Sequence, residues 1–158
     1  MTIERYVLCK ATSVPSFTQL LDELNRTGLR LEIQKAFDPR KSAGFVPCLF
    51  EGLESGFDYS VGSSTLGDFS FTDAQELEAK DLNTTLELST YSNAQEIMSS
   101  TIIAVCLIRL TNGLIVADFE EDFIRPSTAS DWLAANMPEI REQFSGPSII
   151  RQAMRGEA

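Results

Sequence analysis

The sequence predicts one α+β (α/β) domain over residues 1–158. In it, a mixed or mainly antiparallel sheet of about five or six strands packs against a central buried helix at residues 93–110 with flanking helices. The length of 158 residues is typical of one domain. A composition of 43% hydrophobic and 23% charged residues is that of a globular chain. Short segments that alternate every second residue are interspersed with segments of helical period, which indicates both strands and helices.

The N-terminal segment predicts the order strand, helix, strand. Residues 3–9 form a short apolar segment, and residues 29–33 alternate between apolar and polar side chains, as half-buried strands do. Between them, residues 15–27 predict a helix. The residues that mark this helix are Pro15 at its first position, Ser16 and Gln19 as a capping box, Phe17, Leu20, Leu21 and Leu24 as an apolar face, and Gly28 as the C-terminal cap.

An antiparallel hairpin is predicted after a loop at residues 38–44. Residues 45–50 form its first strand, in which Pro47 indicates an edge position or a bulge, because proline cannot donate to a sheet ladder. The composition of residues 51–56 predicts the turn region. Residues 57–61 alternate and predict the return strand.

Residues 62–82 predict an acidic, Gly/Ser-containing insertion or loop. Within it, residues 72–80 indicate a short helix with Thr72 as its N-cap. Acidic side chains occupy its first turns, where the helix dipole favours them. Residues 86–89 alternate again and predict another strand.

Residues 93–110 give the strongest helix pattern in the chain. Asn93 and Glu96 have N-terminal capping spacing, and Gly113 is placed to close the other end. Because residues 102–108 are apolar all round, we expect this helix at the centre of the core. Residues 114–117 follow as a short apolar strand.

The C-terminal part predicts helical pieces. Residues 128–136 and 138–144 have helical patterns, and Pro138 is expected to break one from the other. Residues 149–154 predict a last turn within a C-terminal tail at residues 145–158.

Charge is concentrated in one part of the sequence. Residues 51–81 hold eight acidic side chains and one lysine, which gives −7 of the chain's net −10. A pI near 4.4 disfavours nucleic acid and anionic membranes as partners, because both repel a net anion. It favours a partner with a basic contact surface.

Several other functions are disfavoured by residue content. The chain has no histidine, and its three cysteines lie apart in apolar stretches, so we expect reduced buried thiols and no catalytic residue. The N-terminus lacks the pattern of a signal peptide, and the apolar run at residues 102–108 is shorter than a membrane span. The expectation is therefore a cytoplasmic protein without a cofactor.

Acidic residues also follow the strand at residues 114–117, at positions 118–122. Carboxylates at a strand end can hold Mg²⁺ or Ca²⁺, but this segment lacks the spaced ligands and the glycine of a calcium loop. A solvated turn or a partner-binding patch is the preferred interpretation, and no metal site is predicted. Phe69 and Phe71 lie among the acids of the 62–82 segment and would anchor a basic partner if exposed.

Three stretches together resemble a known class of small bacterial proteins. They are the hairpin pattern at residues 44–59, residues 86–88 with the helix at 93–110, and the turn at 111–113 that leads into residues 114–119. Over roughly residues 44–123 the chain resembles the small cytosolic α/β immunity-type proteins of contact-dependent or type VI secreted toxin systems. The resemblance implies a chain that binds and neutralises one cognate toxin, and it carries no active-site residues to transfer.

The function predicted from these observations is non-enzymatic binding of a cognate protein toxin through an acidic surface. The alternatives are an adaptor or chaperone for a secreted effector and a carboxylate- or metal-dependent enzyme. The sequence leaves the oligomeric state and the toxin's activity open. The candidate contact residues are Glu51, Glu54, Asp58, Asp68, Phe69, Phe71, Asp73, Glu76, Glu78, Asp118, Glu120, Glu121 and Asp122.

Overall fold

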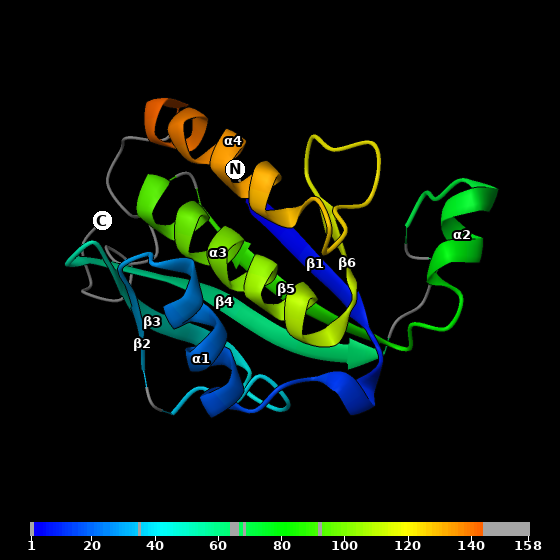
Figure 1. The fold of residues 1–158 in the computed structure, drawn as a ribbon, viewed down its shortest axis with the longest axis horizontal. Helices are drawn as coiled ribbons and strands as arrows, with labels where there is room; N and C mark the ends of the chain where they lie inside the picture. The colour runs from blue at the N-terminus through cyan, green and yellow to red at the C-terminus, as the bar shows by residue number, and fades with distance from the viewer. Residues whose placement is uncertain (1, 35, 64–66, 68, 92, 144–158) are drawn as a thin grey trace.

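A six-stranded antiparallel sheet spans the domain, with strand order β2-β3-β4-β5-β1-β6 (Figure 1). The computed structural model describes residues 2–34, 36–63, 67, 69–91 and 93–143. The prediction of an α+β domain with a mainly antiparallel sheet is confirmed. The strands are β1 (Ile3–Cys9), β2 (Leu31–Ile33), β3 (Gly44–Phe50), β4 (Leu53–Ser63), β5 (Thr84–Thr90) and β6 (Leu114–Ala117).

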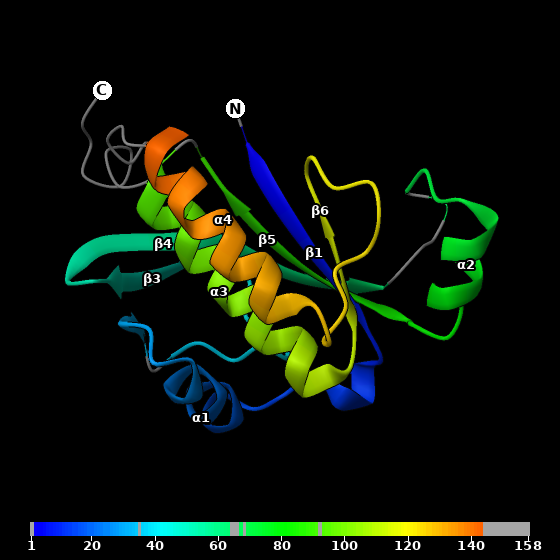
Figure 2. The same cartoon turned by 45° about the horizontal axis from the view of Figure 1, so that its top comes forward.

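Three helices cover one face of this sheet: α1 (Phe17–Thr27), α3 (Ala94–Thr111) and α4 (Ala129–Gln143) (Figures 1 and 2). Helix α3 lies across β1, β4 and β5, and both α1 and α4 pack against it. A 3₁₀ turn, η1 (Ala11–Ser13), leads from β1 towards α1. The short helix α2 (Asp73–Ala79) stands apart from the other three in both views.

Helix α3 is the predicted central helix of the core. It has the length and hydropathy of a membrane span, with 18 residues and a mean hydropathy of 1.3. However, 83% of it is buried inside the domain, so packing against the sheet and two helices accounts for its apolar character. The buried position is that of a core helix.

The predicted caps of α1 and α3 form, with two corrections. Ser16 is the N-cap of α1, and its hydroxyl accepts from the Gln19 backbone at 3.2 Å, so the helix begins at Phe17 and Pro15 precedes it. At the end of α3, Asn112 takes the left-handed conformation (φ 53°) that was expected of Gly113. Asparagine is the residue that most often replaces glycine there.

The β3–β4 hairpin is tighter than predicted. Glu51 (φ 52°) and Gly52 (φ 80°) alone make the turn, so residues 53–56 belong to β4 rather than to the turn. Pro47 lies in an interior strand instead of at an edge. Strand β2 ends at its Ile33–Cys48 pair, and the Pro47 carbonyl accepts from Gln34 at 3.4 Å, so proline occupies the point where the ladder to β2 stops.

Helix α4 is continuous where two pieces were predicted. It runs through Pro138, because proline removes a single backbone donor while Leu133 and Ile140, on either side, are both buried in the core. The predicted end of this segment at Phe144, the turn at residues 149–154 and the tail at 145–158 lie outside the described residues.

Candidate protein-binding surface

The side of the sheet opposite α1, α3 and α4 is here termed the open face. Strand alternation decides which side chains lie on it: in β5, Leu86 and Leu88 are buried under α3, whereas Glu87 points the other way. The same alternation and the strand register place these polar and apolar side chains on the open face: Glu4, Tyr6, Glu32, Phe45, Leu49, Glu54, Asp58, Ser60, Glu87 and Ser89.

Acidic side chains from four strands therefore share the open face without a basic residue among them. In the six described strands the only basic residue is Arg5, and it points to the helix side. In register, Asp58 lies opposite Ser89, and Ser89 lies opposite Glu4. Glu87 is a diagonal neighbour of both acids, at about 7–8 Å between Cα atoms. That spacing is within the screening length of physiological salt, so these charges repel one another.

One carboxylate of the open face is also partly removed from water. Partial burial raises the pKa of Asp58, which means that the fold disfavours its charged form. The Tyr6 hydroxyl donates to Glu4, and burial together with Glu4 raises the pKa of Tyr6. The Ser89 hydroxyl donates to Glu87 at 3.3 Å. A basic group from outside would relieve the repulsion that these internal hydroxyls only partly offset.

An apolar border accompanies the acids along β3. Leu49 is 40% exposed on this face. Leu53, which opens β4 and is 52% exposed, pairs with the buried Phe50 and therefore lies on the helix side. The Phe45 ring lies over Gly56, where an added Cβ would come within 2.4 Å of the ring. Apolar side chains beside the acids add area that a protein partner could bury on contact.

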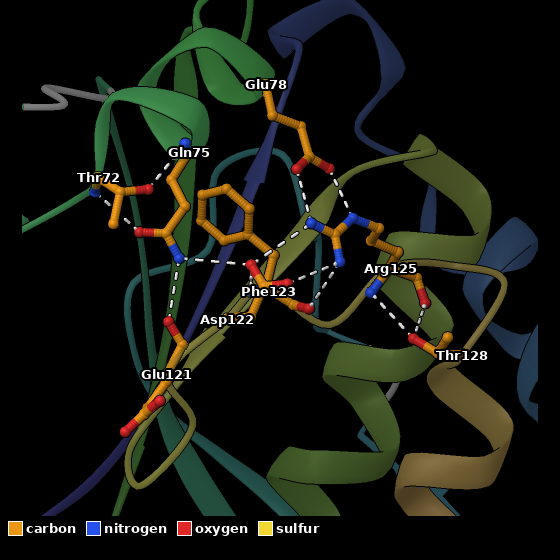
Figure 3. Close-up of polar contacts among 8 residues, drawn as sticks. All are labelled: Thr72, Gln75, Glu78, Glu121, Asp122, Phe123, Arg125 and Thr128. Carbon is orange, nitrogen blue, oxygen red and sulfur yellow. Dashed lines mark hydrogen bonds and ion pairs between the residues drawn. The ribbon is translucent and has the colours of Figure 1, made fainter.

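A second acidic region joins α2 to the loop at residues 118–128 (Figure 3). The Arg125 guanidinium donates to both carboxylate oxygens of Glu78 at 2.7 Å and forms an ion pair with Asp122 at 3.2 Å. The Gln75 amide donates to the Glu121 carbonyl at 3.0 Å. Arg125 holds the pKa of Asp122 below its usual range. Helix α2 is thus attached to this loop through polar contacts.

Phe69 and Phe71 connect the two regions and are not exposed anchors. They stack on each other with ring centroids 5.0 Å apart. Phe69 contacts Tyr6 of the open face edge-on at 5.2 Å, and Phe71 contacts Phe123 in the same way at 5.1 Å. Both rings belong to a small second core on the open side of β1 and β6.

The structure distributes the predicted contact residues over several places. Glu54 and Asp58 lie on the open face, and Asp73, Glu76, Glu78, Glu121 and Asp122 lie on α2 and its loop. Glu51 instead pairs with Arg141 of α4. Asp118 accepts from the Glu4 backbone at 3.0 Å, and Glu120 accepts from the Trp132 indole at 3.1 Å. Asp68 lies outside the described residues.

Sequence reasoning missed three acids of the open face. Glu4, Glu32 and Glu87 lie outside the acidic segment on which the prediction was based. Strand pairing places Glu87 diagonal to Asp58. It places Glu4 two strands away from Asp58, and Glu32 two strands away from Glu54. The signal that identifies them is their alternation with buried residues. In residues 86–89 the same alternation that predicts a strand also places Glu87 opposite the buried leucines.

The described residues hold neither a metal-ligand cluster nor an exposed thiol. No group of three or more cysteine, aspartate or glutamate side chains is placed there to hold a metal ion. The three cysteines are free and buried. Burial raises the pKa of Cys9 to about 11 and those of Cys48 and Cys106 to about 12, which keeps them as unreactive thiols.

Comparison with known proteins yields no match: no protein family, no curated protein and no solved structure is significantly similar to the chain. The fold and the surface therefore carry the functional argument by themselves. They define an α+β domain with helices on one side of an antiparallel sheet and a carboxylate-bearing face on the other.

Proposed function

We propose that this chain is a non-enzymatic immunity-type protein that binds and neutralises a secreted bacterial toxin of a contact-dependent or type VI system in the cytoplasm. The observation that carries the proposal is the open face, where acids from four strands meet without a basic neighbour among the strand residues. The resemblance over roughly residues 44–123 points to the same class and includes β3, β4 and β5 of this face.

The electrostatics of the open face suit a partner with a basic site. Toxins that act on nucleic acids or nucleotides carry basic active sites, and an acidic surface covers such a site while accelerating encounter. The exposed apolar side chain of Leu49 on the same face would slow dissociation by burying area on contact. We place the α2 acids Asp73 and Glu76, which are exposed, as the second part of the contact.

A cytoplasmic location fits the cysteine chemistry. All three thiols are free, and reduced thiols are typical of a reducing compartment. An immunity-type protein would meet an incoming toxin there.

The test begins with capture of the partner. Tagged protein is incubated with lysate of the cells that naturally produce it, washed at low and then at high salt, and the bound proteins are identified. The proposal expects one stoichiometric basic protein that salt releases. That protein should halt growth when produced alone and be tolerated when produced together with this chain. Unchanged toxicity on co-production would overturn the proposal.

An adaptor for a secreted effector is the second candidate, and two exposed apolar side chains favour it. Phe119 is 86% exposed and Leu77 of α2 is 65% exposed. An adaptor would hold an apolar client segment there, so its binding would persist at high salt and would depend on Phe119 rather than on Asp58.

A further inference from the structure

A cavity of about 490 Å³ lies on the helix side of the sheet, away from the open face. It is lined by β1, α3, α4 and the segment that follows β6, and that volume is within the range of small-molecule sites. Its wall combines the guanidinium of Arg5, the indole of Trp132, the apolar side chain of Ile140 and the carboxylates of Asp118, Glu120 and Glu139.

Arg5 is the unusual group in this wall. Its side chain belongs to a residue only 6% exposed, and its guanidinium carbon lies 5.7 Å from the centre of the Trp132 ring. Nη1 donates to the Glu4 carbonyl at 3.3 Å, but Nε has no hydrogen-bond acceptor among the described residues. Burial lowers the pKa of Arg5, while the charges of Asp118 and Glu120 raise it. A buried guanidinium that remains charged with an unpaired Nε is costly, and an anionic ligand group beside the guanidinium would stabilise its charge.

The carboxylates around the cavity use only part of their capacity to accept hydrogen bonds. Asp118 accepts from the Glu4 backbone, Glu120 from the Trp132 indole, and Glu139 from the Gln143 amide at 3.1 Å, each through one oxygen. For the second oxygen of each, the described part of the chain supplies no donor. Three carboxylates against one guanidinium give this wall a formal charge of −2. A simple anion would satisfy Arg5 but would be repelled by the rest of the wall.

We propose that this cavity binds the chemistry of a basic amino acid, in which a carboxylate and a distal cation occur in one small molecule. The ligand carboxylate would pair with the Arg5 guanidinium that lines the cavity, and the ammonium or guanidinium group would face Asp118, Glu120 and Glu139. The same chemistry occurs in free arginine or lysine and at the C-terminus of a peptide that ends in either residue. This site is separate from the toxin-binding surface and does not depend on it.

The binding experiment uses the fluorescence of Trp132, which is the only tryptophan of the chain. The full-length protein is titrated with L-arginine, L-lysine, agmatine, which lacks the carboxylate, and acetate, which lacks the cation. The proposal predicts a saturable change with the two amino acids and about tenfold weaker binding of agmatine and of acetate. It is overturned if no saturable change occurs up to about 10 mM, or if agmatine binds as well as L-arginine.

Two further comparisons test the assignment of residues and the source of the ligand. Glu120→Gln keeps an acceptor for the Trp132 indole but removes a charge, and we expect about tenfold weaker arginine binding. Glu121→Gln, its exposed neighbour outside the cavity wall, serves as the matched control and should bind as the wild type does. Equal affinities of the two variants would contradict the proposal, and Arg5→Met, if folded, should abolish binding.

A short peptide with C-terminal arginine identifies the source of the ligand. Tighter binding of the peptide than of free arginine, lost on amidation of its carboxylate, would assign the site to a chain end. Weaker binding of the peptide would assign it to the free amino acid. An amidated peptide that binds as tightly as the free acid would contradict the role of Arg5, whatever the outcome of the toxin experiment.

Discussion

At the residue scale, Gly56 lies directly beneath the ring of Phe45 on the open face. The Phe45 ring of β3 lies where the side chain of any other residue at position 56 would begin. An added Cβ would be 2.4 Å from the ring and 2.7 Å from the Val46 carbonyl oxygen, which belongs to the backbone of the paired strand and cannot rotate away. Glycine at this position therefore allows Phe45 to cover the sheet.

Replacement of Gly56 by alanine should destabilise the fold. We expect Gly56→Ala to lower the free energy of unfolding by about 1–3 kcal/mol, because the new methyl group displaces either the ring or the strand. Urea denaturation measures the change. Gly62→Ala is the matched control on the same strand, since nothing lies within 4 Å of its added Cβ. Equal stabilities of the two variants would show that Phe45 does not pack as described.

Removal of the Asp58 charge should make the fold more stable. Its pKa is raised in the fold by burial, so its ionised form opposes folding and stability is gained as pH falls through the folded pKa. Asp58→Asn removes that charge, and we expect a higher Tm than wild type at pH 7, with the difference shrinking as the pH approaches about 3. Thermal denaturation across this range measures it.

The control for this variant is Asp22→Asn, on the exposed surface of α1. It should not reproduce the pH-dependent gain. A Tm of Asp58→Asn below that of wild type at pH 7 would mean that the Asp58 charge is stabilised by a neighbour, which would remove one argument for an external basic partner.

At the element scale, α2 depends on Arg125 for its position. The helix has seven residues, too few to be stable alone in water, and only Ala79 among them is buried. Its capping box is formed by Thr72 and Gln75, and its attachment to the 118–128 loop runs through Glu78 and Arg125. Both charged side chains are about one-third exposed, so water weakens each ion pair.

Arg125→Met should loosen α2 more than it destabilises the whole domain. We expect a global loss of about 1 kcal/mol or less, because the contacts are partly exposed. Amide hydrogen exchange of residues 73–79 should become faster while the amides of α3 keep their protection. Lys80→Met removes the same charge at the end of α2 and is the control. Equal exchange rates in wild type and Arg125→Met would contradict the role of Arg125.

Local patterns were sufficient to predict most elements but not the surfaces that they form. The apolar run of β1, the alternation in β5 and the caps at Ser16, Thr72 and Asn93 are properties of neighbouring residues. They could therefore be interpreted without the fold. Pro138 indicates a helix break when only the sequence is considered. The burial of Leu133 and Ile140, which keeps α4 continuous, is a tertiary effect that neighbouring residues do not reveal.

The grouping of residues in the candidate site likewise depends on tertiary contacts that local sequence patterns do not reveal. Residues 51–81 are acidic in sequence, yet strand pairing separates Glu51 from Asp58. It places Asp58 diagonal to Glu87 and two strands away from Glu4. Register over such sequence distances is set by the packing of the whole sheet. Arg5 and its cavity also depend on α4, which follows more than a hundred residues later.

At the scale of the whole molecule, one-sided packing explains why the thiols are protected. Cys48 and Cys106 lie in the core between the sheet and its helices, and Cys9 ends β1 on the same side. Burial raises the pKa of each thiol to about 11 or 12. The reactive thiolate is therefore scarce at neutral pH, and the reagent has no access to the sulfur atoms.

All three thiols should resist modification until the domain unfolds. We expect a thiol-specific reagent at pH 8 to label the native protein no faster than global unfolding exposes the core, and to label three thiols per chain in urea. Absorbance or mass spectrometry measures the labelling. Rapid labelling of one cysteine in the native protein would show that its side of the core opens locally.

The division of the domain into a helix-covered side and an open side leads to the central claim, that the carboxylates of the open face bind a basic protein. The most direct test measures partner affinity after reversal of two diagonal neighbours on this face, Asp58→Lys with Glu87→Lys. The control, Asp22→Lys with Glu142→Lys, makes the same charge change on exposed positions of the helix side. We predict a loss of about 100-fold or more for the first variant, a salt-sensitive wild-type affinity and little change in the control. Equal losses in both variants, or none in either, would contradict the claim that the open face makes the contact.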